Sequence, residues 1–141
     1  MFSRAAEYAI RAMAFLARQP QGKLTGAREI SKAEQIPMAF LWKILQNLAR
    51  RRLIRSFKGL HGGYELAAPA RKVSVEDVVR AMDNGDVAEG CVLGLAECSE
   101  KHPCPLHDSW KDIRGRLAEM MQQTTLADLS AVASRRSRKG R

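Results

Sequence analysis

Residues 37–66 decide the fold of this chain, and their sequence is PMAFLWKILQNLARRRLIRSFKGLHGGYEL. Proline at position 37 suits the first turn of a helix, where its missing N–H would have no partner. After it, apolar residues recur at steps of three and four, which predicts a helix to about Arg52: Met38, Leu41, Ile44, Leu45 and Leu48. The opposite side of this helix is polar. Trp42 flanks the apolar side, and we expect it to pack rather than to stack on bases.

The second half of the stretch predicts a β-hairpin, with strands at residues 53–57 and 64–66 around a glycine-rich turn at 58–63. Upstream, apolar periodicity predicts a helix over residues 2–18 and a shorter one over about 27–34. The shorter helix should stop before Pro37, because a residue that precedes proline is pushed out of the helical region. Three helices followed by a basic hairpin predict a winged helix, whose third helix enters the major groove of DNA while the hairpin lies along the backbone or minor groove.

The distribution of charge favours a nucleic acid as the partner. The 141 residues include 24 basic and 15 acidic ones, for a net charge of +9. Residues 1–66 hold 12 basic and 4 acidic residues, residues 67–133 hold 7 and 11, and residues 134–141 hold 5 and none. A basic part joined to an acidic part suits a chain that faces a polyanion with one half only. No apolar run approaches the ~20 residues that a membrane span needs, and the start of the chain lacks the residue order of a signal peptide, so we expect a cytoplasmic protein without a membrane partner.

The remainder of the chain predicts a mainly α-helical second region. Ser74 and Asp77 have the spacing of a capping box before a helix over 75–83. A narrow apolar stripe that begins at Trp110 predicts a long helix over about 106–123, packed on a partner helix. Thr125 to Asp128 suggests another helix start. We therefore divide the chain into a winged-helix DNA-binding region (1–68), a cysteine loop with dimerisation helices (69–133), and a basic tail (134–141) that we expect to be disordered.

The cysteines lie close together in the sequence. Cys91, Cys98, Cys104 and His107 form the pattern C-x6-C-x5-C-x2-H within one acidic loop. Three unrelated thiols would have no reason to gather there, and a disulfide is less expected in a reducing cytoplasm. A metal site explains the pattern better, because thiolates are soft ligands for zinc or for an iron-sulfur cluster and imidazole can add a further ligand. Structural zinc sites usually contain a tight cysteine pair, which is missing, so the spacing favours an iron-sulfur cluster over zinc.

The wing Gly59-x-x-Gly62-Gly63-Tyr64-x-Leu66, followed by the three cysteines and Cys104-x-x-His107-x-x-Trp110, resembles the bacterial regulator family that includes IscR and NsrR. The segment Tyr8 to Met13 resembles the first helix of that family. The resemblance covers roughly residues 2–130. It implies a homodimeric winged-helix transcription factor, whose long C-terminal helix dimerises and whose loop holds an iron-sulfur cluster.

The ligands follow from the resemblance, position by position. Cys91, Cys98 and Cys104 match the three cysteine ligands, and His107 matches the histidine ligand of IscR-like members, which bind a 2Fe-2S cluster. Glu7 matches the acidic ligand of NsrR-like members, which the other subunit contributes to a 4Fe-4S cluster. The chain departs from the family in its first cysteine spacing and in the wing residues Leu60 and His61. We favour His107 and a 2Fe-2S cluster, with Glu7 of the partner chain as the alternative.

Two groups of residues are candidates for DNA contacts. On the polar side of the third helix, Lys suits guanine while Gln and Asn suit adenine. This group comprises Lys43, Gln46, Asn47 and Arg50. Cations at the end of that helix and in the hairpin suit phosphates or the minor groove. They are Arg51, Arg52, Arg55 and Lys58, to which His61 is added.

The function that we expect is therefore that of a homodimeric transcription regulator which binds double-stranded DNA at a palindromic operator. We favour a repressor over an activator. Its iron-sulfur cluster would sense redox state, nitric oxide or cluster supply. The alternatives are a zinc-bound or cluster-free winged-helix repressor and, least favoured, an iron-sulfur electron carrier. We expect no enzyme, because the sequence has no nucleotide-binding glycine loop and no arrangement typical of a catalytic triad.

Overall fold

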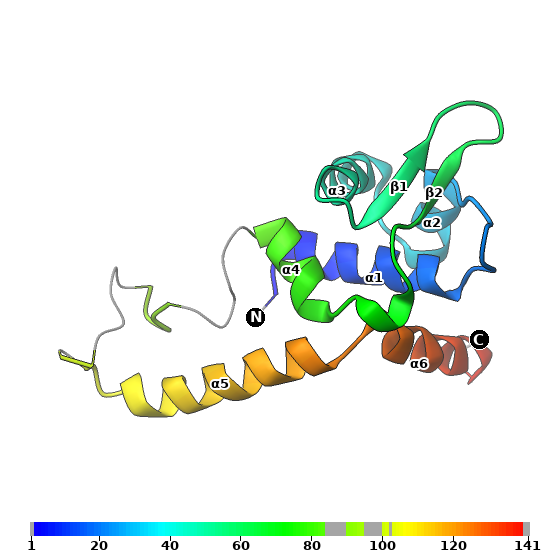
Figure 1. The fold of residues 1–141 in the computed structure, drawn as a ribbon. Coiled ribbons are helices and arrows are strands. Elements are labelled where there is room, and N and C mark those ends of the chain that lie inside the picture. The colour runs from blue at the N-terminus through cyan, green and yellow to red at the C-terminus, as the bar shows by residue number, and fades with distance from the viewer. Residues whose placement is uncertain (1, 84–89, 95–99, 102, 140–141) are drawn as a thin grey trace.

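The structure is a computed structural model that describes residues 2–83, 90–94, 100–101 and 103–139. It is mainly helical, with one two-stranded antiparallel sheet in the described part (Figure 1). In chain order the elements are α1 (Arg4–Arg18), α2 (Ala27–Glu34), α3 (Met38–Arg50), β1 (Ile54–Phe57), β2 (Gly63–Leu66), the single turn η1 (Ala70–Lys72), α4 (Val75–Asp83), α5 (His107–Gln123) and α6 (Leu126–Lys139). The predicted winged-helix fold is confirmed, with small shifts of the element ends.

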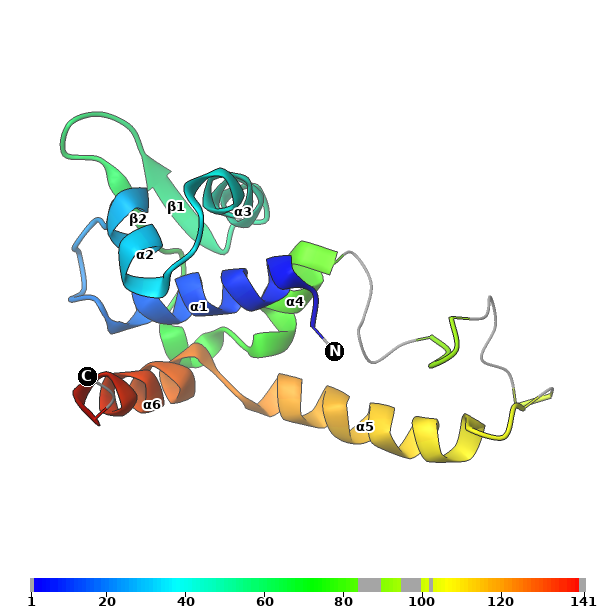
Figure 2. The same cartoon turned by 180° about the vertical axis from the view of Figure 1, so that it is seen from behind.

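Helix α1 lies at the centre of the molecule. Figures 1 and 2 show α3 and the hairpin on one side of it, α6 on the other, and α4 across its N-terminal end. Ala6, Ala9 and Ala12 are fully buried, and their small side chains let the neighbouring helices approach closely. The hydroxyl oxygen of Ser3 accepts from the backbone N–H of Ala6 at 3.0 Å, which starts α1 after Ser3 rather than at the predicted residue 2.

The turn between α2 and α3 has side-chain support. Gln35 ends α2 in the left-handed region, with a φ of 54°. The hydroxyl of Ser31 donates to the carbonyl oxygen of Ile36 at 2.6 Å, and the side chain of Ile36 is buried in the core. Pro37 is the N-cap of α3, one position before the first turn in which the sequence placed it, and its carbonyl oxygen accepts from Leu41 N–H at 3.0 Å. This turn fixes the angle at which α3 leaves the body.

The hairpin is anchored at its base. Ile54 pairs with Leu66 and Phe57 with Gly63. Thr25 and Tyr64 exchange two backbone hydrogen bonds of 3.0 and 2.8 Å, so the connection before α2 adds a one-residue bridge to the sheet. Gly63 has a φ of +149°, and a Cβ there would lie 2.9 Å from the carbonyl oxygen of Thr25. Glycine is therefore required where the hairpin approaches the body.

Two capping boxes join the second region to the body. Ser74 and Asp77 exchange side-chain to backbone hydrogen bonds of 3.0 and 3.1 Å at the start of α4, which confirms the predicted box. Thr125 and Asp128 do the same at α6, with distances of 2.9 and 3.2 Å. The two helix starts lie side by side, because Ser74 and Thr125 form an isolated β-bridge. Helix α6 therefore starts beside α4, and it packs along α1.

Helix α5 extends away from the other helices, which form the body of the molecule, and we call it the arm (Figures 1 and 2). Its last turns pack on the other helices, where the side chain of Met121 is 1% exposed and contacts Ala6, Val75 and Val79. Ile113 and Met120 are 54% and 50% exposed along the arm. None of the helices in the described part of the chain combines the length and apolar character needed to cross a bilayer.

The C-terminal segment differs from our expectation. Residues 134–139 continue α6, whereas the composition predicted a disordered tail. The physical reason is local: α6 is started by its capping box and by Leu126, which is fully buried. Once a helix is nucleated, Ala, Arg, Lys and Ser extend it at little cost.

Candidate DNA interface and cysteine loop

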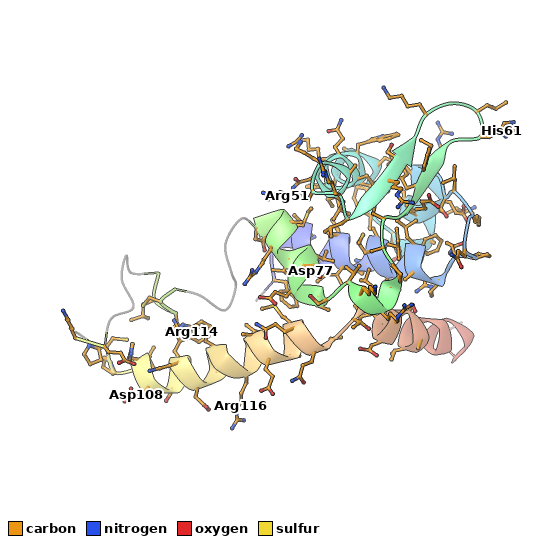
Figure 3. All side chains as sticks on the ribbon, viewed as in Figure 1. Arg51, His61, Asp77, Asp108, Arg114 and Arg116 are labelled. Carbon is orange, nitrogen blue, oxygen red and sulfur yellow. The ribbon has the colours of Figure 1, made fainter. Side chains whose placement is uncertain are left out.

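Helix α3 presents a polar side to solvent. Lys43, Gln46 and Arg50 are exposed, and together with Asn47 and Arg51 they line a shallow hollow. The side chains that we predict to contact guanine or adenine therefore share one surface with the cations Arg50 and Arg51. Figure 3 shows Arg51 at the end of α3 that faces α4.

Asn47 makes a contact that its neighbours do not. Its Nδ2 donates to the carbonyl oxygen of Ala81, in the last turn of α4, at 3.1 Å, and the side chain is only partly exposed. Carbonyl groups in the last turn of a helix have no partner within the helix, so this amide satisfies one of them. Asn47 thus fixes α3 against α4 as well as lying beside the predicted base-reading residues. The sequence did not indicate this contact, because the two residues are 34 positions apart.

Trp42 is less packed than we expected. Its side chain is 49% exposed, and that of Phe40, on another side of α3, is 54% exposed. On the apolar side of the same helix, Leu41 and Leu45 are fully buried. The ring of Phe40 meets that of Tyr8 edge to face, with centroids 6.1 Å apart, which links α3 to α1.

The hairpin cations follow one another along the wing. The guanidinium of Arg55 donates to the carbonyl oxygen of Ala67 at 3.3 Å and lies 3.8 Å from the carboxylate of Glu65, so it also braces the hairpin. Lys58 and His61 are exposed, and Figure 3 places His61 at the tip of the loop. Arg52, with a φ of 62°, turns the chain from α3 into β1. The residues predicted to contact phosphates therefore lie between α3 and the wing tip.

Parts of the cysteine loop are tied to the first half of α5. The carbonyl oxygen of Gly90 accepts from Trp110 Nε1 at 2.8 Å and from the guanidinium of Arg114 at 3.1 Å. Glu100 forms an ion pair with Lys111, on the same part of the helix. This hydrogen bond and the attraction between the charges lower the pKa of Glu100 and raise the pKa of Lys111. Sequence reasoning missed these tethers, since their partners lie 11 to 24 positions apart.

The tethers bring candidate ligands toward one end of α5. Cys91 directly follows Gly90 in the chain. The carbonyl oxygen of Cys104 accepts from the backbone N–H of His107 at 3.0 Å, so these two residues share the turn that starts α5. The side chain of His107 is 5% exposed, whereas Cys91 and Cys104 are half-buried. Cys98 lies outside the described residues.

The described part of the chain contains no group of three His, Cys, Asp or Glu side chains close enough to hold one metal ion. Glu7 is exposed on the first turn of α1, at the end of that helix that points to the side of the molecule where the loop lies (Figure 1). The chemistry of the donors nevertheless fits a cluster. Thiolates and imidazole are ligands that iron-sulfur clusters take, and Cys104 and His107 lie together where α5 begins.

The helical body, the exposed polar side of α3 and the basic two-stranded wing define a winged-helix DNA-binding protein. The model of the Rrf2 family, described as iron-dependent transcriptional regulators, matches residues 2–132, and the chain belongs to this family. It is a DNA-binding transcription regulator rather than an enzyme.

Relatives and solved structures agree with this class. A protein of Mycobacterium tuberculosis (strain H37Rv), provisionally assigned as an HTH-type transcriptional regulator, is 39% identical over 132 residues, which cover 93% of this chain and 81% of the relative. The regulator IscR of Vibrio campbellii is 29% identical, over 86% of this chain and 72% of its own length. The fold matches CymR, the global cysteine regulator of B. subtilis, with a TM-score of 0.81 and 22% identity over 94% and 97% of the two chains. It matches T. potens IscR with a TM-score of 0.74 and 22% identity over 94% and 88%.

Proposed function

We propose that this regulator acts as a homodimer, as a repressor at a palindromic operator, and that an iron-sulfur cluster in its cysteine loop sets its affinity for DNA. The observation that carries the proposal is the attachment of the loop to the first half of α5. The carbonyl oxygen of Gly90 accepts hydrogen bonds from Trp110 and Arg114, and that of Cys104 accepts one from His107. The regulator would respond to redox state, nitric oxide or cluster supply.

The proposed ligands are Cys91, Cys98, Cys104 and His107, with Glu7 of the partner chain as the alternative to His107. When bound, a 2Fe-2S cluster would supply a redox-active group that oxidants and nitric oxide attack. A nitrogen ligand beside three thiolates leaves one iron more labile, which suits a sensor. The burial of His107 supports its assignment, since the imidazole at the start of α5 is not exposed to solvent.

The surroundings of the loop also support a cluster. Val92, Leu93 and Leu106 are 46%, 56% and 47% exposed. Apolar residues beside a metal centre restrict the access of water and tune its redox potential. Shielding of a cluster would therefore explain why these three apolar side chains lie near the cysteines of an otherwise acidic loop.

A contiguous set of contacts leads from the loop to the DNA-reading helix. Helix α4 ends at Asp83, and the loop follows it in the chain. In the last turn of α4, Ala81 is held by Asn47 of α3, and the carboxylate of Asp83 accepts from the hydroxyl of Ser3 at 2.6 Å. A change in the loop that moves this turn would shift α3 and the start of α1. Half-site spacing decides the affinity of a dimer for its operator, so small shifts have a large effect.

Exposed apolar side chains on the arm support a homodimer. Ile113 and Met120 are exposed on α5, a helix whose last turns pack on the body. A second copy of α5 would bury this stripe, as expected for a dimerisation helix. Two wings related by a two-fold axis would then bind two half-sites of a palindrome.

Anaerobic reconstitution of four variants tests the proposal: His107→Ala, Glu7→Ala, Cys98→Ala and, as the control, His61→Ala in the distant wing. Iron and sulfide per chain, the visible and resonance Raman spectra, and operator affinity are measured for each. We expect Cys98→Ala to lose the cluster, His107→Ala to change the spectrum and oxygen stability, and His61→Ala to keep both.

Two results would change the assignment. If Glu7→Ala alters the spectrum while His107→Ala does not, the ligand from the partner chain is preferred. If the protein retains zinc, or binds its operator equally well with and without iron, the chain is a zinc-bound or cluster-free repressor.

A further inference from the structure

The tip of the wing carries a large apolar side chain that no packing requires. Leu60 is 95% exposed, the highest value for a large hydrophobic residue in the described part of the chain. Single exposed apolar residues are common on protein surfaces, so exposure alone does not indicate a role. The conformation and charge of the loop around Leu60 provide the further arguments.

The loop is held in a form that keeps Leu60 projecting. Gly59 has a φ of +102°, and the N–H of Gly62 donates to the carbonyl oxygen of Gly59 at 3.0 Å. This closes a four-residue turn with Leu60 and His61 at its two central positions. A Cβ on Gly62 would lie 2.1 Å from the carbonyl oxygen of Phe57, so the turn depends on glycine for its tight closure. The leucine is therefore presented at the tip by a specific turn.

The charges beside Leu60 match those of a DNA groove. Lys58 and His61, both exposed, flank the leucine in the sequence at distances of two positions and one, and residues 54–63 contain no Asp or Glu. The minor groove has an uncharged floor of base edges between two rows of phosphates. An apolar tip between positively charged or polar side chains has the complementary arrangement.

We propose that Leu60 enters the minor groove at the flank of each half-site and packs on the edges of A·T pairs, which makes it a specificity-determining residue. A G·C pair adds the guanine 2-amino group to the groove floor. Against leucine, that donor would lose its water without gaining an acceptor, so the affinity should fall. The inference rests on the proposed binding to an operator.

The experiment uses the full chain and an operator selected from random duplexes. Hydroxyl-radical footprinting locates the flank under the wing, and its A·T pairs are then replaced by G·C or by inosine·C. Inosine lacks the 2-amino group but presents the major groove of guanine. We expect G·C to weaken binding about tenfold and inosine·C to restore affinity to within about twofold of A·T, since the groove floor is then free of the amino group.

Three variants assign the effect to the side chain. Leu60→Ala should bind the G·C and inosine·C operators with the same affinity, whereas Leu60→Met should keep the discrimination. Lys58→Ala, the control, should weaken both operators alike and reduce the slope of log K against log salt by about one. Thermal unfolding should be unchanged in Leu60→Ala, because the side chain has no packing to lose.

The proposal is overturned if Leu60→Ala discriminates as the parent chain does, or if the parent binds its selected operator without distinguishing G·C from inosine·C. It is also overturned if Leu60→Ala alters the sedimentation of the free protein but not its DNA preference, which would make the tip a contact between proteins. If no sequence is selected over random DNA, the proposed binding to an operator is wrong. That result differs from an operator that is selected but is bound equally well with G·C and with inosine·C in the flank.

Discussion

At the scale of single residues, Gln46 and Asn47 are neighbours on α3 but differ in what they contact. Gln46 is exposed at the hollow, while the amide of Asn47 is bonded to Ala81 of α4. Helical periodicity placed both on the polar side, and it was right about their side of the helix. Periodicity carries no information on which polar residue meets another helix, and that is why the contact of Asn47 appears only in the fold.

Replacing these two residues by alanine should have different consequences. Asn47→Ala should weaken operator and random DNA alike and reduce the free energy of unfolding by about 1 kcal/mol, because a partly buried hydrogen bond is lost. Gln46→Ala should change the preferred base and leave stability unchanged. Fluorescence anisotropy with both DNAs and urea unfolding measure the two effects. A loss of operator binding alone in Asn47→Ala, at full stability, would show that Asn47 reads bases instead.

Glycine at the wing can be tested by comparing two positions. Gly62→Ala places a Cβ 2.1 Å from a backbone oxygen, whereas Gly59→Ala meets nothing within 4 Å and adds only the strain of its positive φ. We expect Gly62→Ala to distort the wing and reduce DNA affinity about tenfold or more, consistent with a cost on the order of 1–3 kcal/mol. Gly59→Ala should have the smaller effect. Equal losses would mean that strain, not the clash, governs this turn.

At the scale of elements, α5 acts both as an arm and as a support for the loop. Its C-terminal turns are anchored by Met121, and its N-terminal half is tied to Gly90 and Glu100. Sequence periodicity predicted the length of α5 and assigned Trp110 to its apolar stripe. The structure adds that the indole N–H of Trp110 holds the loop, a role for which a stripe of apolar residues gives no signal.

Trp110→Phe should loosen the loop, because it removes the donor to Gly90 and keeps most of the ring. We expect faster hydrogen exchange over residues 90–94 and faster alkylation of Cys91 in the cluster-free protein, by roughly three- to tenfold, as one hydrogen bond is worth about 1 kcal/mol. Arg116→Ala, an exposed change on the same helix, is the control. Unchanged alkylation in Trp110→Phe would show that Arg114 alone holds this segment.

At the scale of the whole molecule, the basic winged helix and the exposed arm are separate parts of one fold. The α4 and α6 helix starts tie the second region to α1, and α3 and the wing lie on the other side of α1 (Figure 1). This arrangement leaves α5 free for a second copy without covering the polar side of α3.

Binding should be dimeric and strongly dependent on salt. With four to six phosphates contacted, log K should fall with log salt at a slope of roughly −4 to −5. Ile113→Asp should dissociate the dimer and reduce operator affinity at least about tenfold, because a charge would be buried between the two copies of α5. Sedimentation and salt titrations check both. A dimer that tolerates Ile113→Asp, with full affinity, would place the interface elsewhere.

The sequence by itself determined the helices, the hairpin, the helix starts at Ser74 and Thr125, and the side of α3 that faces solvent. These features depend on spacing and caps within a few residues, which the chain order displays directly. Only the tertiary structure decided that Trp42 is exposed, that Asn47 holds α4, and that Trp110 and Arg114 hold Gly90. Each of these depends on which element covers a given side chain, and therefore on contacts between residues far apart in the chain.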